Sequence, residues 1–152
     1  MNDGSSEYQW IKLCKYFFNL KTDLCLCLIY YSPKSTVNFI ELLGKDITEK
    51  YNKKWDILLA GDVNARTGSC PEFIENDTST HIPIPNHCYN VDFVKERRVS
   101  QGTMTYSRGK ELLELCIGNQ LRILNGRRFG NTTGRFTYFK TNGSSVVDYM
   151  IA

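Results

Sequence analysis

The feature that most constrains this chain is the segment Ile57–Arg66, which reads Ile-Leu-Leu-Ala-Gly-Asp-Val-Asn-Ala-Arg. Its first four residues are apolar and predict a short buried strand, which Gly61 ends. If the chain stays extended beyond this point, Asp62 and Asn64 project to the same side. A carboxylate and an amide at the open end of a buried strand suit the activation of water beside a developing negative charge. On its own, however, Gly-Asp-x-Asn fits a turn closed by an Asx hydrogen bond better than it fits a catalytic pair.

Three elements are predicted before this segment. Residues 7–13 alternate as a strand does, and turn residues then lead into the apolar run Leu24–Tyr31. This run is apolar on both faces, which predicts a central strand that is covered on both sides. Pro33 ends it, because proline cannot donate to a ladder of hydrogen bonds. Residues 35–51 have apolar side chains at three-four spacing, which predicts a helix capped by Ser35.

The later part of the chain predicts a second helix and three strands. The helix covers residues 109–120, and a short strand follows at 121–124. Strands at 135–140 and 145–151 are separated by an Asn-Gly turn, the strongest short signal for a hairpin. The whole pattern predicts an α+β protein in which helices pack outside a mostly antiparallel sheet system.

Length and composition suit one folded domain. The 152 residues are 41% apolar and carry a net charge of +3, which permits an anionic partner without requiring one. We predict a disordered tail at residues 1–7 and a single domain over residues 8–152. The polar, acidic start is unlike a secretory signal, and no apolar run is long enough to span a membrane. We therefore expect an intracellular protein, nuclear or cytoplasmic, with no membrane partner.

Six cysteines and two histidines raise the question of a metal site. The sequence has no Cys-x-x-Cys pair, so free structural thiols in a reducing compartment are the favoured interpretation. His81 and His87 lie near Cys70 and Cys88 within the loop-rich segment 67–107. Their spacing matches no standard structural zinc pattern, which favours ordinary loop residues over zinc ligands.

Two charged features near the end of the chain could belong to a site. Arg127 lies in the basic loop 125–130, which would stabilise a nearby anion, although solvated charge clusters are more common. Asp148 interrupts an otherwise apolar strand. Because a buried carboxylate needs a partner, Asp148 either forms a structural pair or orients a catalytic group.

Four separated motifs, taken together, resemble one known family. They are Tyr31-Ser32-Pro33, Gly61–Arg66, Gly109–Leu113 with Asn125-Gly126-Arg127, and Phe136-Thr137-Tyr138 with Ser145–Tyr149. The chain resembles the endonuclease/exonuclease/phosphatase superfamily, most closely the apurinic-type endonuclease domain of non-LTR (LINE-type) retrotransposons. The resemblance covers almost the whole chain from Tyr8 onward. It implies a four-layered α/β sandwich, in which two sheets pack face to face between helices and the active site opens at one end.

The resemblance also implies a reaction, the hydrolysis of a DNA phosphodiester with magnesium or manganese. Asp62 is the expected general base, and Asn64 is expected to hydrogen-bond the phosphorane and, with Asp62, to hold the metal. Tyr31 is expected to donate its phenol to a phosphate oxygen, and Asp148 to orient an active-site histidine. Such a site places a base and several donors around the extra charge of a pentacovalent phosphorus. The expected substrate-binding residues are Arg66, Arg127 and Thr137.

The sequence also departs from the family pattern. The strand that bears the family's metal-binding glutamate should precede Tyr8 and is missing, and so is the histidine that Asp148 would orient. His81 and His87 stand out of motif order and do not replace it. We therefore expect a partial sandwich that lacks both ends of the domain, binds metal poorly and is inactive or nearly so as this chain. Loss of a phosphate-stabilising side chain typically lowers the rate by about 10²–10³.

Three functions stay open on the sequence alone. The first is a fragment of a retrotransposon-type DNA endonuclease. The second is a domesticated, noncatalytic nucleic-acid-binding or interaction module, against which the retained motif residues argue mildly. The third is a phosphatase of the same superfamily, which Ala65-Arg66 and the segment Asn125–Arg127 disfavour.

Overall fold

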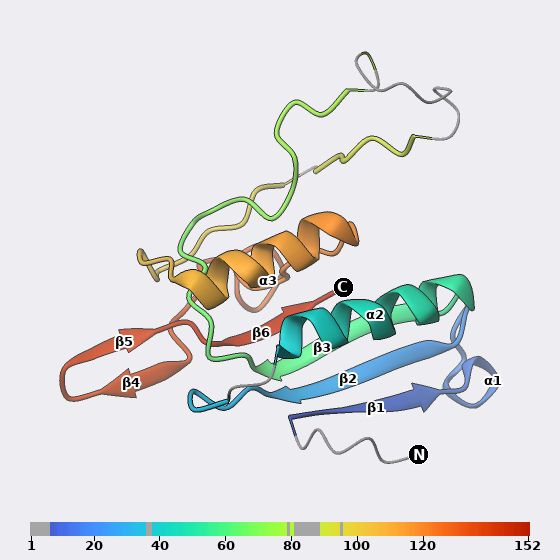
Figure 1. The fold of residues 1–152 in the computed structure, drawn as a ribbon, viewed down its shortest axis with the longest axis horizontal. Helices are drawn as coiled ribbons and strands as arrows, with labels where there is room; N and C mark the ends of the chain where they lie inside the picture. Colours follow the sequence, from blue (N-terminus) through green and yellow to red (C-terminus); the bar gives the residue numbers. More distant parts are fainter. Residues whose placement is uncertain (1–6, 36–37, 79, 81–88, 95) are drawn as a thin grey trace.

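The structure is a computed structural model that describes residues 7–35, 38–78, 80, 89–94 and 96–152. Within these residues the chain forms a four-stranded sheet, a two-stranded sheet and three helices (Figure 1). The larger sheet has the order β1-β2-β3-β6, with β1 (Tyr8–Leu13), β2 (Leu24–Tyr30), β3 (Asp56–Asp62) and β6 (Asp148–Ile151). Its β2–β3 pair is parallel, and the other two pairs are antiparallel. The predicted α+β class, with two mostly antiparallel sheets and packed helices, is confirmed.

The central strand β2 buries one face. Cys25, Cys27 and Ile29 are buried, whereas Leu28 and Tyr30 on the opposite face are 45% and 59% exposed. Successive side chains of a strand point to opposite faces, so the described residues cover this strand on one side. The prediction that both faces of β2 are covered is therefore wrong.

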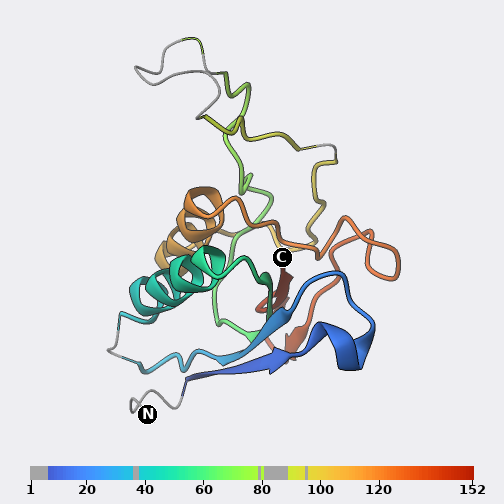
Figure 2. The ribbon, with the colours of Figure 1, turned by 90° about the vertical axis from the view of Figure 1, so that its right-hand side faces the viewer.

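Two long helices cover that buried face. Figures 1 and 2 show α2 (Phe39–Asn52) and α3 (Ser107–Gly118) lying side by side over the four-stranded sheet. They approach closely at Gly44, where an added Cβ would lie 3.2 Å from Leu115 Cδ1. Burial of each large apolar side chain between helix and sheet contributes about 1.5–3 kcal/mol. The largest fully buried apolar side chains on these helices are Phe39, Leu43, Ile47 and Leu112.

Helix α2 begins later than the sequence predicts. Its first residue is Phe39, and the Asn38 carboxamide oxygen accepts a hydrogen bond from the Glu41 amide at 3.4 Å. An Asn side chain that satisfies an amide of the first turn is a favourable N-cap. Asn38 therefore occupies the capping position that was predicted for Ser35.

The last elements are shorter than predicted. A hairpin of β4 (Tyr138–Lys140) and β5 (Gly143–Ser145) forms around the Asn-Gly turn and extends beyond the end of the larger sheet (Figure 1). The predicted strand at 145–151 divides into the end of β5 and all of β6. The predicted strand at 121–124 is reduced to an isolated bridge between Ile123 and Ile151.

A short helix, α1 (Lys15–Phe18), occupies the turn between β1 and β2 and was not predicted. In the part of the chain that the structure describes, no helix combines the length and the apolar character needed to cross a membrane. Most of the tail predicted at 1–7 lies outside the described residues.

Candidate active site

The two predicted carboxylates meet at one end of the sheet. Asp62 is the last residue of β3, and its register partners are Tyr30 in β2 and Asp148 in β6. Directly opposed residues of an antiparallel pair project to the same face of the sheet. The sheet therefore brings Asp62 and Asp148 together at the open end of a buried strand, although they lie far apart in the sequence.

Asn64 forms a turn just beyond this strand end. Its backbone is left-handed, with φ of 47°, a conformation that Asn tolerates better than most residues. Its amide nitrogen donates to Asp62 Oδ1 at 2.9 Å, and its side-chain Nδ2 donates to the carbonyl of Tyr31 at 2.9 Å. The premise of an extended chain is wrong, and the Asx turn is confirmed. This same turn fixes the Asp62 carboxylate and joins β3 to the end of β2.

The environment of Asp62 favours its protonated form. Burial raises the pKa of this carboxyl, the hydrogen bond from the Asn64 amide opposes the rise, and the negative charge of Asp148 adds to it. A carboxylate with a raised pKa is a better proton acceptor at neutral pH than an ordinary one. The raised pKa is compatible with the role of general base, which stays a prediction for Asp62.

We expect the Asp148→Asn substitution to lower the pKa of Asp62, because it removes one of the two causes that raise it. The pKa should stay above the ordinary aspartate value, since burial is the larger cause. Because the pKa is raised in the folded chain, ionisation of Asp62 opposes folding. The free energy of unfolding therefore falls as the pH rises through this pKa, and it should fall less in the variant. An NMR titration of the carboxyl carbon measures the pKa of Asp62 in the wild-type chain and in the variant. Asp56→Asn, at the other end of β3, is the control, and equal pKa values in all three proteins would contradict the coupling.

Asp148 is held in place by two side chains. The Thr137 hydroxyl accepts hydrogen bonds from the amides of Val147 and Asp148 at 3.0 and 3.1 Å. The Asn125 side chain donates to the Asp148 carbonyl at 3.1 Å and accepts from the Met150 amide at 2.9 Å. Thr137, predicted to bind substrate, thus holds the backbone of the site. Asn125 was not predicted as a site residue, because its partners depend on how the chain returns beside β6.

Tyr31 packs on the helix side of the sheet. Its ring is buried, stacks on Phe39 with centroids 4.5 Å apart, and lies 4.1 Å from the Arg108 guanidinium. Arg108 also donates to the carbonyls of Ser32 and Pro33 at 3.0 and 3.2 Å. Arg108 therefore fixes the Tyr31-Ser32-Pro33 segment, a role that the sequence analysis missed. The ring of Tyr31 is part of the core around α2.

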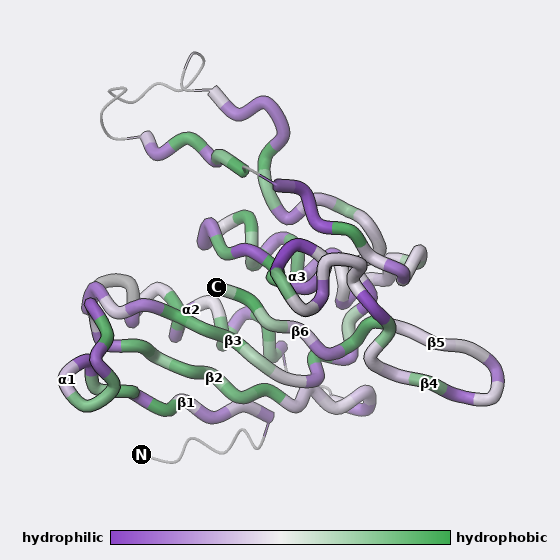
Figure 3. Tube along the Cα trace, turned by 180° about the vertical axis from the view of Figure 1, so that it is seen from behind, coloured by the Kyte–Doolittle hydropathy of each residue, from purple (hydrophilic) through white to green (hydrophobic). Residues whose placement is uncertain are grey.

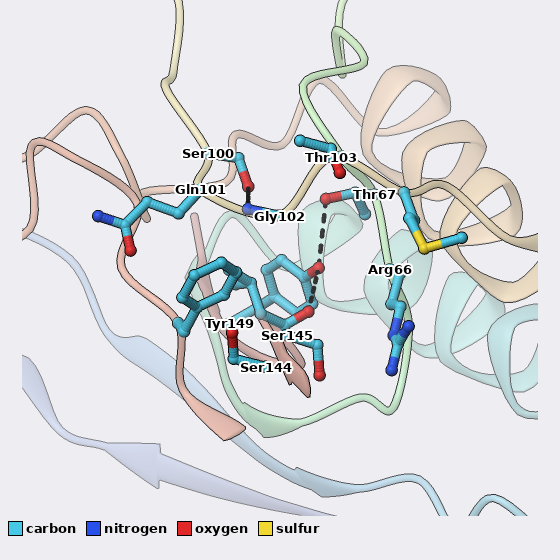
Figure 4. A pocket seen from close by; sticks show the side chains of 13 residues that line it. Arg66, Thr67, Ser100, Gln101, Gly102, Thr103, Ser144, Ser145 and Tyr149 are labelled. Carbon is cyan, nitrogen blue, oxygen red and sulfur yellow. Dashed lines mark hydrogen bonds between the residues drawn. The ribbon is translucent and has the colours of Figure 1, made fainter. Parts of the chain in front are cut away.

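Arg66 lines a small pocket that also includes Tyr149, the residue that follows Asp148. Figure 4 shows this pocket, of about 120 Å³, with the Thr67 and Tyr149 hydroxyls turned toward each other at 3.2 Å. Arg66 also lies 5.2 Å from the ring of Tyr106. The buried Ser145 hydroxyl, also in the lining, has no hydrogen-bond partner within the described part of the chain. With one cation, several hydroxyls and no carboxylate in its lining, the pocket suits an anionic or hydroxyl-bearing group.

Arg127 lies in the interior, where it pairs with Glu72. Its side chain is 4% exposed, and its Nη2 lies 2.6 Å from Glu72 Oε1. Burial lowers the pKa of Arg127, and the charge of Glu72 offsets part of that effect. Glu72 also pairs with Arg98, whose Nε lies at 3.2 Å. The structure thus places Arg127 in a buried ion cluster.

The oxygen donors at the strand ends fit a hard divalent cation. Asp62 and Asp148 offer carboxylates and Asn64 an amide, and Mg²⁺ in proteins commonly uses one or two carboxylates and completes its shell with waters and substrate phosphates. No cluster of three or more His, Cys, Asp or Glu residues suited to a metal is present among the described residues. His81 and His87, considered as zinc ligands with Cys88, lie outside those residues. The cysteines that the structure does describe are free thiols, as predicted.

Comparison with known proteins finds a likeness in fold. No protein-family model and no curated protein matches the sequence. Among solved structures, the chain is similar to the endonuclease domain of TRAS1, a telomere-specific non-LTR retrotransposon, with a TM-score of 0.54 and 15% identity. This chain shares the fold of that endonuclease domain. The match covers 96% of this chain and 50% of the TRAS1 chain, so the present chain spans about half the length of its structural neighbour.

This endonuclease-type fold agrees with the resemblance drawn from the sequence motifs. The identity of 15% supports the fold and leaves the roles of Tyr31, Asp62, Asn64 and Asp148 as predictions. What the structure adds is the arrangement in which the two carboxylates, Asp62 and Asp148, lie opposite each other at one end of the sheet.

Proposed function

We propose that this chain carries the phosphodiester-hydrolysing site of a DNA endonuclease of the non-LTR retrotransposon type. The observation that carries the proposal is the pairing of Asp62 with Asp148 across β3 and β6, beside the turn at Asn64. The fold shared with a retrotransposon endonuclease domain supports a nuclease-like function in general terms. DNA is the proposed partner, which would place the protein in the nucleus or cytoplasm.

In the proposed reaction, Asp62 acts on a water molecule that attacks phosphorus. The water oxygen bonds to phosphorus, the bond from phosphorus to one sugar oxygen breaks, and Asp62 takes the proton that the water releases. The leaving oxygen takes a proton from solvent. The negative charge of Asp148 helps to raise the pKa of Asp62, and Thr137 and Asn125 hold the backbone of Asp148. Arg66 offers a positive charge to the substrate from the pocket that it lines.

A magnesium or manganese ion held by Asp62, Asn64 and Asp148 would neutralise charge on the phosphate when bound. The Asn64 side chain already donates to the Tyr31 carbonyl through Nδ2, which leaves its oxygen as the group available to a cation. Such an ion would relieve the mutual repulsion of the two carboxylates.

We also propose that this polypeptide alone cleaves DNA slowly or not at all. Two side chains assigned to substrate are held within the fold. Arg127 pairs with Glu72, and the ring of Tyr31 is buried against Phe39 and Arg108. Each donor withheld from the phosphorane costs about 10²–10³ in rate.

The test is a nicking assay on supercoiled plasmid and on an abasic duplex, with magnesium. The wild-type chain should nick no faster than Asp62→Ala, while binding duplex DNA with an affinity that falls as salt rises. Arg66→Ala should weaken that binding more than Arg97→Ala, whose side chain pairs with Glu75 at the surface. Magnesium-dependent nicking by the wild-type chain that Asp62→Ala abolishes would overturn the proposal of low activity, and it would support the assignment of the active site. Binding that neither magnesium nor Arg66→Ala affects would favour the noncatalytic module, and no DNA binding at low salt would overturn the proposed function.

A further inference from the structure

A group of exposed aromatic side chains lies at the end of the sheet opposite to Asp62. Tyr16 and Phe17 in α1 are 84% and 83% exposed, and Phe18 and Leu20 are also exposed. Figures 1 and 3 show α1 at the outer end of the β1–β2 connection. Large apolar side chains gathered on one surface mark interaction sites more often than scattered single ones do.

Backbone hydrogen bonds hold this turn in one conformation. The Lys15 amide donates to Asp23 Oδ1, and the Leu20 amide donates to the Lys15 carbonyl, both at 2.9 Å. Asn19 closes the helix with a left-handed backbone, at φ of 53°. The rings are therefore presented to solvent by an ordered turn.

Lysines lie on this turn and on the turn that joins it. Lys15 Nζ lies 5.1 Å from the centroid of the Tyr16 ring, and Lys21 is exposed nearby in sequence. The turn between α2 and β3 joins this surface, because the Asp56 amide donates to the Asp23 carbonyl, and it adds the exposed Lys54. Lys15, Lys21 and Lys54 form no ion pair within the described residues.

We propose that this aromatic-lysine patch, made of Lys15, Tyr16, Phe17, Lys21 and Lys54, binds single-stranded nucleic acid. Unpaired bases would stack on the exposed rings, and the lysines would contact the adjoining phosphates. The strand is single because bases within a duplex are stacked on one another and offer only their edges. Three cations without ion pairs favour an anionic polymer over an apolar protein surface, where burial would strip their hydration.

The patch is separate from the proposed active site. Six rises of about 3.3 Å separate Asp56 from Asp62, so the two ends of β3 lie about 20 Å apart. The inference rests on the proposed function only in taking nucleic acid as the partner. Binding of single strands at the patch can therefore be lost while binding at the active site is kept, and the reverse also holds.

The test measures binding of a fluorescein-labelled oligothymidine to the full chain by fluorescence anisotropy. Phe17→Ala should raise the Kd about tenfold, the effect typical of one lost stacking ring. Phe17→Tyr keeps a ring and should retain binding. Phe93→Ala, which removes a ring that is 80% exposed elsewhere, is the matched control and should have no effect. Lys15→Ala with Lys21→Ala should reduce the salt dependence of binding.

Duplex DNA binding distinguishes the patch from the active site, because Phe17→Ala should leave it unchanged. Circular dichroism and urea unfolding establish that each variant is folded. Equal Kd values for wild type, Phe17→Ala and Phe93→Ala would overturn the proposal. So would a wild-type chain that binds phosphatidylserine vesicles or self-associates through Phe17 while showing no affinity for oligothymidine.

Discussion

Glu72→Gln should lower the free energy of unfolding by about 3 kcal/mol, the largest effect expected from removing a single charge in this chain. Glu72 is fully buried and pairs with two arginines, Arg98 and Arg127, whose side chains are 3% and 4% exposed. Without the carboxylate, two guanidinium groups stay buried with no opposite charge. The isosteric amide keeps one accepting oxygen, so one of the two guanidinium groups retains a hydrogen bond, which places the effect at the low end of the range for broken buried pairs.

The cluster also joins parts of the chain that are distant in sequence. Arg98 donates to the Thr67 hydroxyl at 3.0 Å and to the Cys70 carbonyl at 2.9 Å, while its Nε pairs with Glu72. Arg127 extends the same cluster to the loop that follows Asn125. Loss of Glu72 should therefore loosen the segment after Asn64 together with the loop that supports Asp148.

Glu75→Gln is the matched control. Glu75 lies three residues from Glu72 and pairs with Arg97 at 2.9 Å, but the two side chains are 46% and 75% exposed. Exposed pairs of this kind contribute at most about 1 kcal/mol, so urea unfolding should separate the two variants clearly. Small and equal losses in both would contradict the view that the interior cations depend on Glu72.

The position of Arg127 shows that the sequence alone does not reveal contacts between distant segments. Its position in a basic loop suggested a phosphate contact, because a local charge pattern carries no information about a carboxylate much earlier in the chain. Asp62 and Asp148 were recognised by their motifs, and strand periodicity predicted β3 and much of β6. Their direct opposition, however, depends on the register of the β3–β6 pair, which only the folded chain fixes.

Local conformation was predicted in part. The turn chemistry of Asp62 and Asn64 was correctly anticipated as an Asx hydrogen bond, since both residue types favour it. The continuous apolar run of β2 correctly predicted a central strand, but not that Leu28 and Tyr30 would be exposed. Periodicity shows that a face is apolar, while the elements that cover it are set by the tertiary arrangement.

Gly61→Ala should destabilise the chain by about 4 kcal/mol and displace Asp62. A Cβ built at Gly61 would lie 2.1 Å from the carbonyl oxygen of Ile29, and the backbone φ of 137° is one that side-chain-bearing residues rarely adopt. The collision would force β3 away from β2 at the residue that precedes the proposed base. Backbone strain of this kind costs about 1–3 kcal/mol, and overpacking against a fixed neighbour adds about 1–3 kcal/mol.

Gly143→Ala separates these two causes. Gly143 has a similar φ of 146° in the β4–β5 hairpin, and a Cβ there would meet no atom within 4 Å. It should therefore show the strain alone, so the difference between the variants in urea unfolding measures the contact with Ile29. A carboxyl NMR titration should also show a changed pKa for Asp62 in Gly61→Ala and an unchanged one in Gly143→Ala. Equal losses and equal titrations would mean that the close approach of β2 to Gly61 does not position the carboxylate. If the losses differ, that approach is the reason why the chain needs glycine immediately before its proposed general base.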